Sequence, residues 1–278
     1  MVTTDTNAPQ QPFSTLAAFL AGIRIVMVNT TLPANIGSAA RAMHTMGLTQ
    51  LTVVAPKLPI DEDAYAHAAG AKAILDAVTI CDTLEQALQD CHWVIATSSR
   101  QRHIPRPVLS PRQAAELMVT NFHSLGDLMT DSAHRNWQLA IVFGREDRGL
   151  TNEELQLADY HIQIPANPQY GVLNVAAAVQ VIASVFYETA ELALTAKTAA
   201  EKSIDLTFRQ QWDEPPISNE QRLQLENRLL ALLENLDIYN PAQSKVMPQR
   251  INRLLSRLQL DIKEYQLLQA TIAKLLKR

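Results

Sequence analysis

Short apolar runs alternate with stretches of helical character over the first two thirds of the chain. Residues 23–28 form a β-branched run of strand length, and the Ala-rich segment 38–46 that follows has helical character. Further short apolar runs occur at 51–55, 78–80, 93–97, 139–143 and 162–164. Helical stretches at 84–89, 112–120 and 175–191 separate or follow these runs. Runs that are apolar on both faces and alternate with helices predict a parallel sheet covered by helices, which is an α/β fold.

The pattern changes in the last third of the chain. The alternation weakens beyond residue 192, and leucines return at helical spacing from residue 223, followed by helical segments at 246–258 and 263–277. We therefore expect a flexible tail at 1–20, an α/β domain at 21–192, a linker at 193–217 and a small all-helical extension at 218–278. The extension has few residues for a core of its own, so we expect it to pack on the α/β domain or on a partner subunit.

Composition and charge refine this picture. Of the 278 residues, 47% are hydrophobic and 19% are charged, which excludes collagen-like and disordered classes. The net charge of −4 argues against a nucleic-acid binder, but it is unevenly spread. Residues 216–278 carry 10 Lys and Arg against 6 Asp and Glu, whereas the preceding residues carry 14 against 22. A basic extension on an acidic body indicates a polyanionic partner.

The sequence also predicts a cellular location. The longest apolar stretch, 173–187, is interrupted by Asn174, Gln180 and Ser184, and so falls short of the roughly 18–20 apolar residues of a membrane span. Residues 1–15 contain no Lys or Arg and lack the basic start of a signal peptide. The two cysteines form no disulfide framework, which indicates a reducing compartment. We expect a cytoplasmic protein that makes no membrane contact.

Loops that follow strands are where α/β proteins bind ligands, and the first such loop is Asn35-Ile36-Gly37-Ser38-Ala39-Ala40-Arg41. We expect Asn35 or Ser38 to cap the helix, and Gly37 to keep the helix start open for an anion. Arg41 would then lie about one turn into the helix. The simpler interpretation is a capped helix with a surface arginine.

A second loop, residues 143–154, has the sequence FGREDRGLTNEE. Gly144 and Gly149 have the spacing of a phosphate-binding loop, but Leu150 stands where that loop requires lysine, so a P-loop is excluded. Thr151 and Glu154 form a capping box that predicts a helix start. Capping does not explain a glycine at the strand end beside four consecutive charged residues.

Two more segments carry candidate chemistry. Residues 164–174, IPANPQYGVLN, join a strand to an apolar helix, and their exposed backbone groups suit the edge of an adenine ring. Residues 97–102, TSSRQR, follow a strand with small hydroxyl side chains and then two arginines, which suits a polar ligand beside a phosphate. Rigid connections explain the prolines, but they do not explain Asn174 at the start of so apolar a helix.

Other chemistries find little support. The chain has no GxGxxG dinucleotide motif, no GxSxG hydrolase elbow and no HExxH zinc motif, and its seven histidines are scattered. We therefore expect no metal site, and a metabolic enzyme of plain Rossmann type is a weak alternative.

In this order, the segments NIGSAAR, FGREDRGLTNEE and IPANPQYGVLNVAAAVQV resemble the three motifs of the SpoU/TrmH branch of the SPOUT methyltransferases, over residues 22–188. TSSRQRHIP and residues 246–258 are similar, more narrowly, to the bacterial subgroup that methylates the ribose of the pyrimidine at tRNA position 32. The resemblance implies an α/β domain with a C-terminal trefoil knot. It also implies an obligate homodimer, S-adenosylmethionine held in the knot, and 2′-O-methylation of nucleotide 32 in the tRNA anticodon stem-loop.

The resemblance assigns roles to individual residues. It implies catalytic roles for Arg41 and Arg100. It implies a cofactor site formed by Thr97, Ser98, Ser99, Gly144, Ile164, Gly171, Val172 and Leu173. We expect substrate RNA to contact Asn35, Arg102, Glu146, Asn174, Arg250, Arg253 and Arg257.

Four alternatives stay open. Arg41 either loses its proton in the complex, or stays cationic and orients the ribose hydroxyl, and we favour the second because a guanidinium is nearly always protonated. Val172 replaces a serine that many relatives carry, which makes a non-catalytic RNA-binding protein an alternative. The fold also serves other tRNA and rRNA sites. The basic face of residues 250–257 either contacts RNA or is a solvated face on a packing helix.

Overall fold

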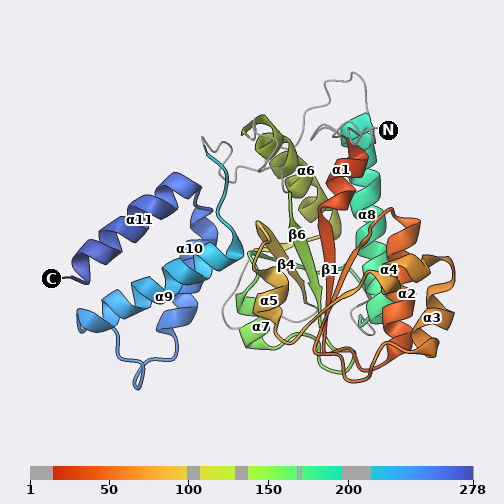
Figure 1. Ribbon diagram of the computed structural model, residues 1–278, viewed down its shortest axis with the longest axis horizontal. Helices are drawn as coiled ribbons and strands as arrows, with labels where there is room; N and C mark the ends of the chain where they lie inside the picture. The colour runs from red at the N-terminus through yellow and green to blue at the C-terminus, as the bar shows by residue number, and fades with distance from the viewer. Residues whose placement is uncertain are drawn as a thin grey trace, which may run out of the picture.

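The computed structural model describes residues 15–98, 107–128, 137–167, 169, 171–195 and 214–277 (Figure 1). Its centre is a seven-stranded sheet in the order β3-β2-β1-β6-β4-β7-β5. The strands are β1 (Ile23–Val28), β2 (Gln50–Val54), β3 (Thr79–Cys81), β4 (Trp93–Thr97), β5 (Val108–Leu109), β6 (Leu139–Phe143) and β7 (Tyr160–Ile162). Every neighbouring pair is parallel, so all carboxyl ends meet at one edge. The predicted α/β class with a parallel sheet is confirmed.

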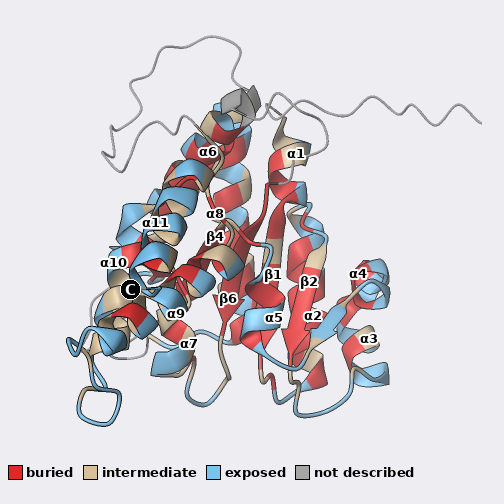
Figure 2. Cartoon of the chain, turned by 60° about the vertical axis from the view of Figure 1, so that its left-hand side comes forward, coloured by how far each residue is buried: buried red, intermediate tan, exposed pale blue. Residues whose placement is uncertain are grey.

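Helices cover both faces of the sheet (Figures 1 and 2). The helices of the α/β domain are α1 (Leu16–Ala21), α2 (Pro33–Thr45), α3 (Glu62–Ala68), α4 (Lys72–Asp76), α5 (Leu84–Leu88), α6 (Pro111–Leu128), α7 (Asn152–Gln156) and α8 (Val175–Thr195), with a 3₁₀ turn η1 (Ala69–Ala71). In the second half of the domain β4 lies between β6 and β7, and β5 lies outside β7. This interleaved order fits the knotted domain that the resemblance implies.

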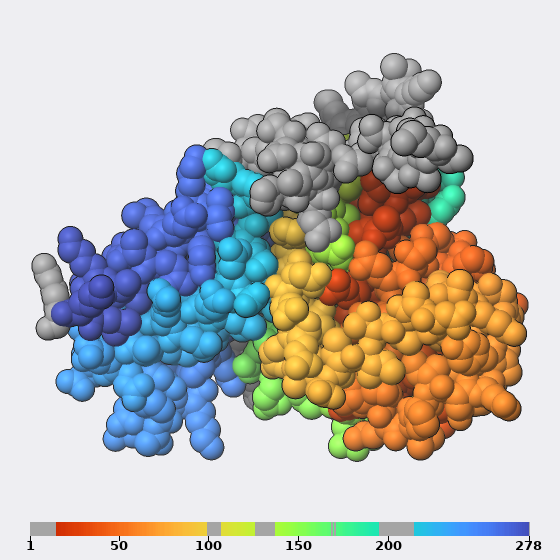
Figure 3. All heavy atoms as spheres, in the orientation of Figure 1, coloured from red at the N-terminus to blue at the C-terminus, as the bar shows by residue number. Residues whose placement is uncertain are grey.

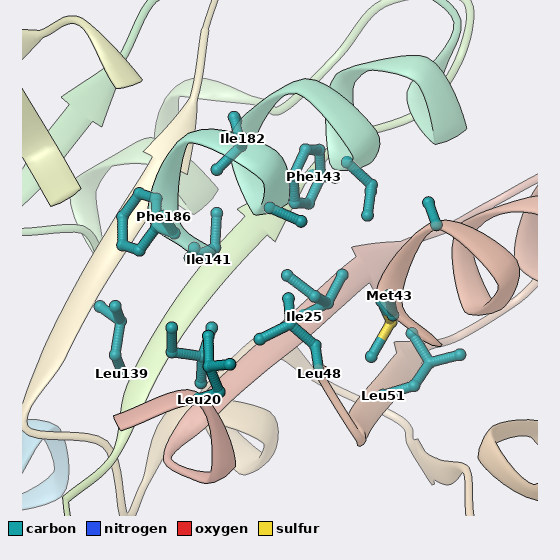
Figure 4. Packing of buried hydrophobic residues seen from close by; sticks show 14 of the residues in the cluster. Leu20, Ile25, Met43, Leu48, Leu51, Leu139, Ile141, Phe143, Ile182 and Phe186 are labelled. Carbon is teal, nitrogen blue, oxygen red and sulfur yellow. The ribbon is translucent and has the colours of Figure 1, made fainter. Parts of the chain in front are cut away.

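The period of two along a strand divides the core between the two faces. Ile25 and Ile141 belong to a large cluster with Met43 of α2 and Phe186 of α8, which Figure 4 shows from close by. Val26 and its like-facing neighbours belong to the second cluster, under α5 and α7. Strands that are apolar on both faces can only form in the middle of such a three-layer structure, which is why the sequence shows continuous apolar runs.

The structure corrects several sequence-based boundaries. β7 ends at Ile162, whereas the sequence placed a strand at 162–164, and the two-residue strand β5 was missed. Helices α1, α3 and α4 were also missed, because with five to seven residues each they are too short to show a helical period. Helix α6 reaches Leu128, eight residues beyond the prediction.

Helix α2 differs most from the prediction. It begins at Pro33, not at residue 38, because proline at the first helical position needs no hydrogen bond and already has a helical φ angle. Neither Asn35 nor Ser38 caps it, and the N-cap residue, Leu32, makes no side-chain cap bond. Arg41 consequently lies more than two turns into the helix.

Gly37 has a packing role and does not form an anion site. It lies inside α2, where an added Cβ atom would sit 1.9 Å from the carbonyl oxygen of Ala64 on α3. The absence of a side chain lets the backbones of α2 and α3 come close together.

Helix α8 is longer than the sequence indicated. Residues 175–194 are long and apolar enough to cross a membrane by length and composition alone, and the core helix of an α/β domain passes the same test. Val179, Ile182 and Phe186 are fully buried in the main core, and α8 packs on α1, α2 and α6. This burial accounts for the apolar residues on the side of α8 that faces the core.

The C-terminal extension consists of three helices, α9 (Asn219–Asn235), α10 (Met247–Leu258) and α11 (Ile262–Leu275). It forms a separate lobe beside the α/β domain (Figure 3). Its small core contains Leu225, Leu232, Leu255 and Ile272. The lobe docks on the loops that precede β4 and β7, where the backbone N–H of Asn219 donates to the carbonyl oxygen of Cys91 at 2.9 Å.

We predict that Gly37→Ala destabilises the protein by about 1–3 kcal/mol, because the new methyl group overpacks the α2–α3 contact. Gly70→Ala is the matched control, since nothing lies within 4 Å of a Cβ atom added there. Chemical denaturation of the two variants measures the free energies of unfolding. Equal stability of the two variants would contradict the close approach of α2 and α3.

Candidate functional site

A cavity of about 170 Å³ lies at the carboxyl edge of the sheet, at the ends of β4, β6 and β7. This is the edge where parallel α/β sheets bind ligands. Of the predicted cofactor residues that the structure describes, all seven line this cavity, namely Thr97, Ser98, Gly144, Ile164, Gly171, Val172 and Leu173. Ser99 lies outside the described residues.

Two hydrogen bonds connect the strand ends that line the cavity. The Thr97 hydroxyl donates to the carbonyl oxygen of Val142 at 3.0 Å, and the Ser98 N–H donates to the carbonyl oxygen of Ile162 at 3.0 Å. These two bonds join the ends of three adjacent strands. The loops that line the cavity are therefore held in fixed relative positions.

Gly144 is required by the turn that forms one wall. Residues 145–149 fold back so that the Gly149 N–H donates to the carbonyl oxygen of Arg145 at 2.9 Å, and Gly149 has a φ angle of +70°. A Cβ atom on Gly144 would sit 2.3 Å from the backbone of Gly149 and Leu150. The glycine at the strand end, which helix capping did not explain, permits this tight turn.

The same turn is fixed by a nearly buried ion pair. Both guanidinium nitrogens of Arg145 donate to Glu154, at 2.9 and 2.8 Å, and Arg145 also contacts the side chain of Asn29. Burial alone would raise the pKa of Glu154, but the hydrogen bonds from Arg145 and from the Thr151 N–H outweigh it and lower the pKa. Glu154 thus closes the predicted capping box and anchors the cavity wall at once.

A second network joins the three predicted motifs. The Asn35 side-chain amide donates to Glu146 at 2.8 Å, and the Asn174 amide donates to the Asn35 oxygen at 3.0 Å. The Thr31 N–H also donates to Glu146 at 3.1 Å. Hydrogen bonds from Asn35 and backbone N–H groups lower the pKa of Glu146 against the opposing effect of burial. Three residues predicted to contact substrate therefore hold one another in place.

Residues 171–173 form an apolar edge at the opening of the cavity. Val172 is 70% exposed and Leu173 is 40% exposed, although both are apolar. The inner wall behind them is formed by Ile162, Ile164 and Val175. Sequence reasoning missed Ile162 and Val175 as lining residues because both also belong to the hydrophobic core. A cavity with apolar walls and exposed backbone groups suits a planar aromatic ring with polar edges.

Neither of the predicted catalytic arginines is among the described residues that line this cavity. Arg41 is exposed on α2 and is absent from the residues that line the cavity of its own chain. Arg100 and Arg102 lie outside the described residues.

The arginines of the extension lie on α10. Arg250 and Arg257 are exposed and Arg253 is half-buried. Leu254 and Leu258, on the neighbouring face, are each 41% exposed, so that part of the helix is not a packing face.

Comparisons with known proteins place this site in a family. The model of the SpoU rRNA Methylase family matches residues 22–184. Over 258 residues the chain is 37% identical to the tRNA (cytidine/uridine-2′-O-)-methyltransferase TrmJ of Klebsiella pneumoniae, and the alignment covers 92% of this chain and 97% of that one. The chain belongs to the SpoU methylase family. The resemblance found in the sequence is confirmed.

Other relatives agree with this placement. The tRNA (cytidine/uridine/adenosine-2′-O-)-methyltransferase TrmJ of Pseudomonas aeruginosa is 49% identical over 160 residues, an alignment that covers 58% of each chain. The crystal structure of TrmJ from Z. mobilis superposes with a TM-score of 0.71 at 27% identity, covering 92% of this chain and 99% of that one. The similarity to this structure includes the helical extension.

We predict that Glu154→Gln lowers the free energy of unfolding by about 2 kcal/mol, because it leaves the nearly buried Arg145 without its charge partner. The pKa of Glu154 is lowered in the folded protein, so its stabilising effect is present above the ordinary carboxyl pKa and is lost as the pH falls below it.

Unfolding curves between pH 7 and pH 3 test this expectation. Glu153→Gln, on the same helix but exposed, is the control and is expected to leave stability within about 0.5 kcal/mol. If the free energies of unfolding of both variants fall by the same amount as the pH is lowered, the ion pair does not hold the turn.

Proposed function

We propose that this chain transfers the methyl group of S-adenosylmethionine to a ribose 2′-hydroxyl of tRNA. The observation that carries the proposal is the convergence of residues 97–98, 144–149, 164 and 171–173 on one cavity at the strand ends. The similarity to TrmJ over nearly the whole length of the Klebsiella enzyme supports tRNA as the substrate.

The residues present fit the cofactor. Gly144 lets the turn at 145–149 fold close to the end of β6 and form one wall of the cavity, and Ile162, Ile164 and Val175 offer an apolar wall to the adenine ring. When bound, S-adenosylmethionine supplies a methyl group on a positively charged sulfur. Backbone groups of Ser98, Leu173 and the turn after Gly144 hold it in this proposal, so Val172 in place of serine does not abolish binding.

Arg41 acts in this proposal from a second copy of the chain. It does not line the cavity of its own chain, and it lies on the exposed side of α2, which packs beside α8. Where the two helices meet, the Thr45 hydroxyl donates to Gln180 at 3.3 Å. This face is the proposed homodimer interface, and it brings Arg41 to the cavity of the partner. Arg41 remains cationic there and orients the 2′-hydroxyl for attack on the methyl group.

The finer assignments also belong to the proposal. The substrate nucleotide is the pyrimidine at position 32 in the anticodon stem-loop, and the basic face of α10 binds tRNA phosphates. Arg100 and Arg102 assist RNA binding or catalysis. Because its substrate is tRNA and its cysteines are free, the protein works in the cytoplasm.

The test is incubation with methyl-labelled S-adenosylmethionine and either total tRNA or rRNA, followed by mapping of the labelled nucleotide. We expect label at the 2′-oxygen of nucleotide 32 in tRNA. Label at another tRNA or rRNA position would keep the reaction and change the substrate. RNA binding without label in either pool would show a non-catalytic binding protein.

We predict that Arg41→Ala lowers the rate of methyl transfer by about 100-fold or more, because positioning of the hydroxyl supplies much of the rate enhancement. Binding of S-adenosylmethionine, measured by calorimetry, stays unchanged. His44→Ala, also exposed on α2, is the control and keeps its activity. Wild-type activity in Arg41→Ala would exclude any catalytic role for this side chain.

We predict that replacing Arg250 and Arg257 together by Gln weakens tRNA binding and flattens its salt dependence. Each lost phosphate contact reduces the slope of log affinity against log salt by about 0.7–0.9, so the double variant should lose roughly 1.5. The matched control replaces Lys274 of α11 and Lys277, two residues beyond the end of that helix, both of which are exposed. An unchanged slope in the arginine variant would leave α10 as a packing helix.

A further inference from the structure

Arg222 of α9 is a buried arginine at the junction between the extension and the α/β domain. It is only 6% exposed. One guanidinium nitrogen donates to Asp159 and to the Ser256 hydroxyl of α10, each at 2.6 Å. The other donates to Asn219 at 2.6 Å and to the carbonyl oxygen of Leu157 at 2.9 Å. A single side chain thus joins two helices of the extension to two points of the domain.

The two domain residues that Arg222 contacts, Asp159 and Leu157, are next to elements that form the cavity. Asp159 precedes β7, and its second carboxylate oxygen accepts the Val94 N–H of β4 at 2.9 Å. Leu157 is the C-cap residue of α7, a helix of five residues that also packs against α10. Arg222 therefore holds the far end of α7 through a backbone carbonyl group.

The other end of α7 is held by Arg145, a residue of the cavity wall. Glu154 lies one helical turn before Leu157 and makes the two-point ion pair with Arg145, which lines the cavity wall. A helix this short has little stability of its own, so its position is set by the contacts at its two ends. Arg222, α7, Glu154 and Arg145 form a continuous chain of direct contacts from the extension to the cavity.

We infer that α7 is a mechanical link that couples RNA binding by the extension to cofactor binding in the cavity, with Arg222 as its positioning residue. This inference rests on the proposed function. Movement of the extension on RNA shifts α7 through Leu157, and α7 shifts the turn at 145–149 through Glu154. Because coupling between two binding sites is reciprocal, the cofactor strengthens RNA binding by the same factor.

The test measures the affinity for S-adenosylhomocysteine, which cannot donate a methyl group, with and without a saturating unmodified tRNA transcript. The ratio of the two dissociation constants is the coupling factor. We expect a factor of about 10 for the full-length wild-type chain, within the range that coupled sites show. Arg222→Lys keeps the charge but loses the fork of donors, and we expect its coupling factor to fall below about 2.

Matched variants separate coupling from docking. Arg228→Lys, on the exposed side of the same helix, should keep the wild-type factor. Glu154→Gln breaks the link at its other end without touching the extension, and it should lower the factor as Arg222→Lys does. The double variant should lower it no further than either single variant, because both act on one link.

The outcomes are distinct. If Arg222→Lys lowers the factor but Glu154→Gln leaves it unchanged, Arg222 only fastens the extension and the inference is wrong. A wild-type factor of one, in a chain that does methylate tRNA, would overturn the link and leave the proposed function intact. A wild-type chain that neither binds nor methylates tRNA contradicts the proposed function itself.

Discussion

The hydrogen bonds between Glu146, Asn35 and Asn174 are the constraint on which the cavity depends. They join residues 111 and 139 positions apart in the sequence, from three loops or helix starts that have no sheet partners of their own. Each loop loses conformational entropy when it is fixed, at about 1–2 kcal/mol per residue. In this partly buried network the three polar side chains hydrogen-bond to one another, which offsets part of that cost and leaves the cavity formed before any ligand enters.

Because the cavity is already formed, the polar residues around it have a structural role that the sequence did not indicate. Asn35, Glu146 and Asn174 were expected to contact RNA because they stand in the three motifs. In the structure their hydrogen-bonding groups are largely engaged with each other and with the protein backbone. Their contribution to function is therefore first to place the loops, and the groups left for a ligand are mainly backbone groups, apolar walls and arginines.

The strands were predictable because β-branched apolar runs buried on both faces have few other stable arrangements, and β1, β4 and β6 were placed to the residue. The start of α2 was not, because the segment from Pro33 to Gly37 is rich in residues that usually mark loops. Because the predicted helix began five residues too late, Arg41 was placed near its start, and Gly37 was wrongly assigned to an anion-binding site. Only the three-dimensional contact with Ala64 shows why residue 37 is glycine. The parallel sheet predicted which loops converge, but not which side chains they would use to hold each other.

The position of the extension constrains how RNA reaches the site. The extension docks at the amino ends of β4 and β7, while the cavity lies at their carboxyl ends, about 16 Å away for a five-residue strand. A tRNA that touches both must run along this side of the domain, across α7 or the loops beside it. In the proposed function, long-range attraction makes the basic extension, and not the acidic body, the first contact for tRNA. A buried arginine with four acceptors joins the extension to α7 more firmly than an apolar contact that can slide, so a shift of the extension is passed on to α7 and is not lost at the junction.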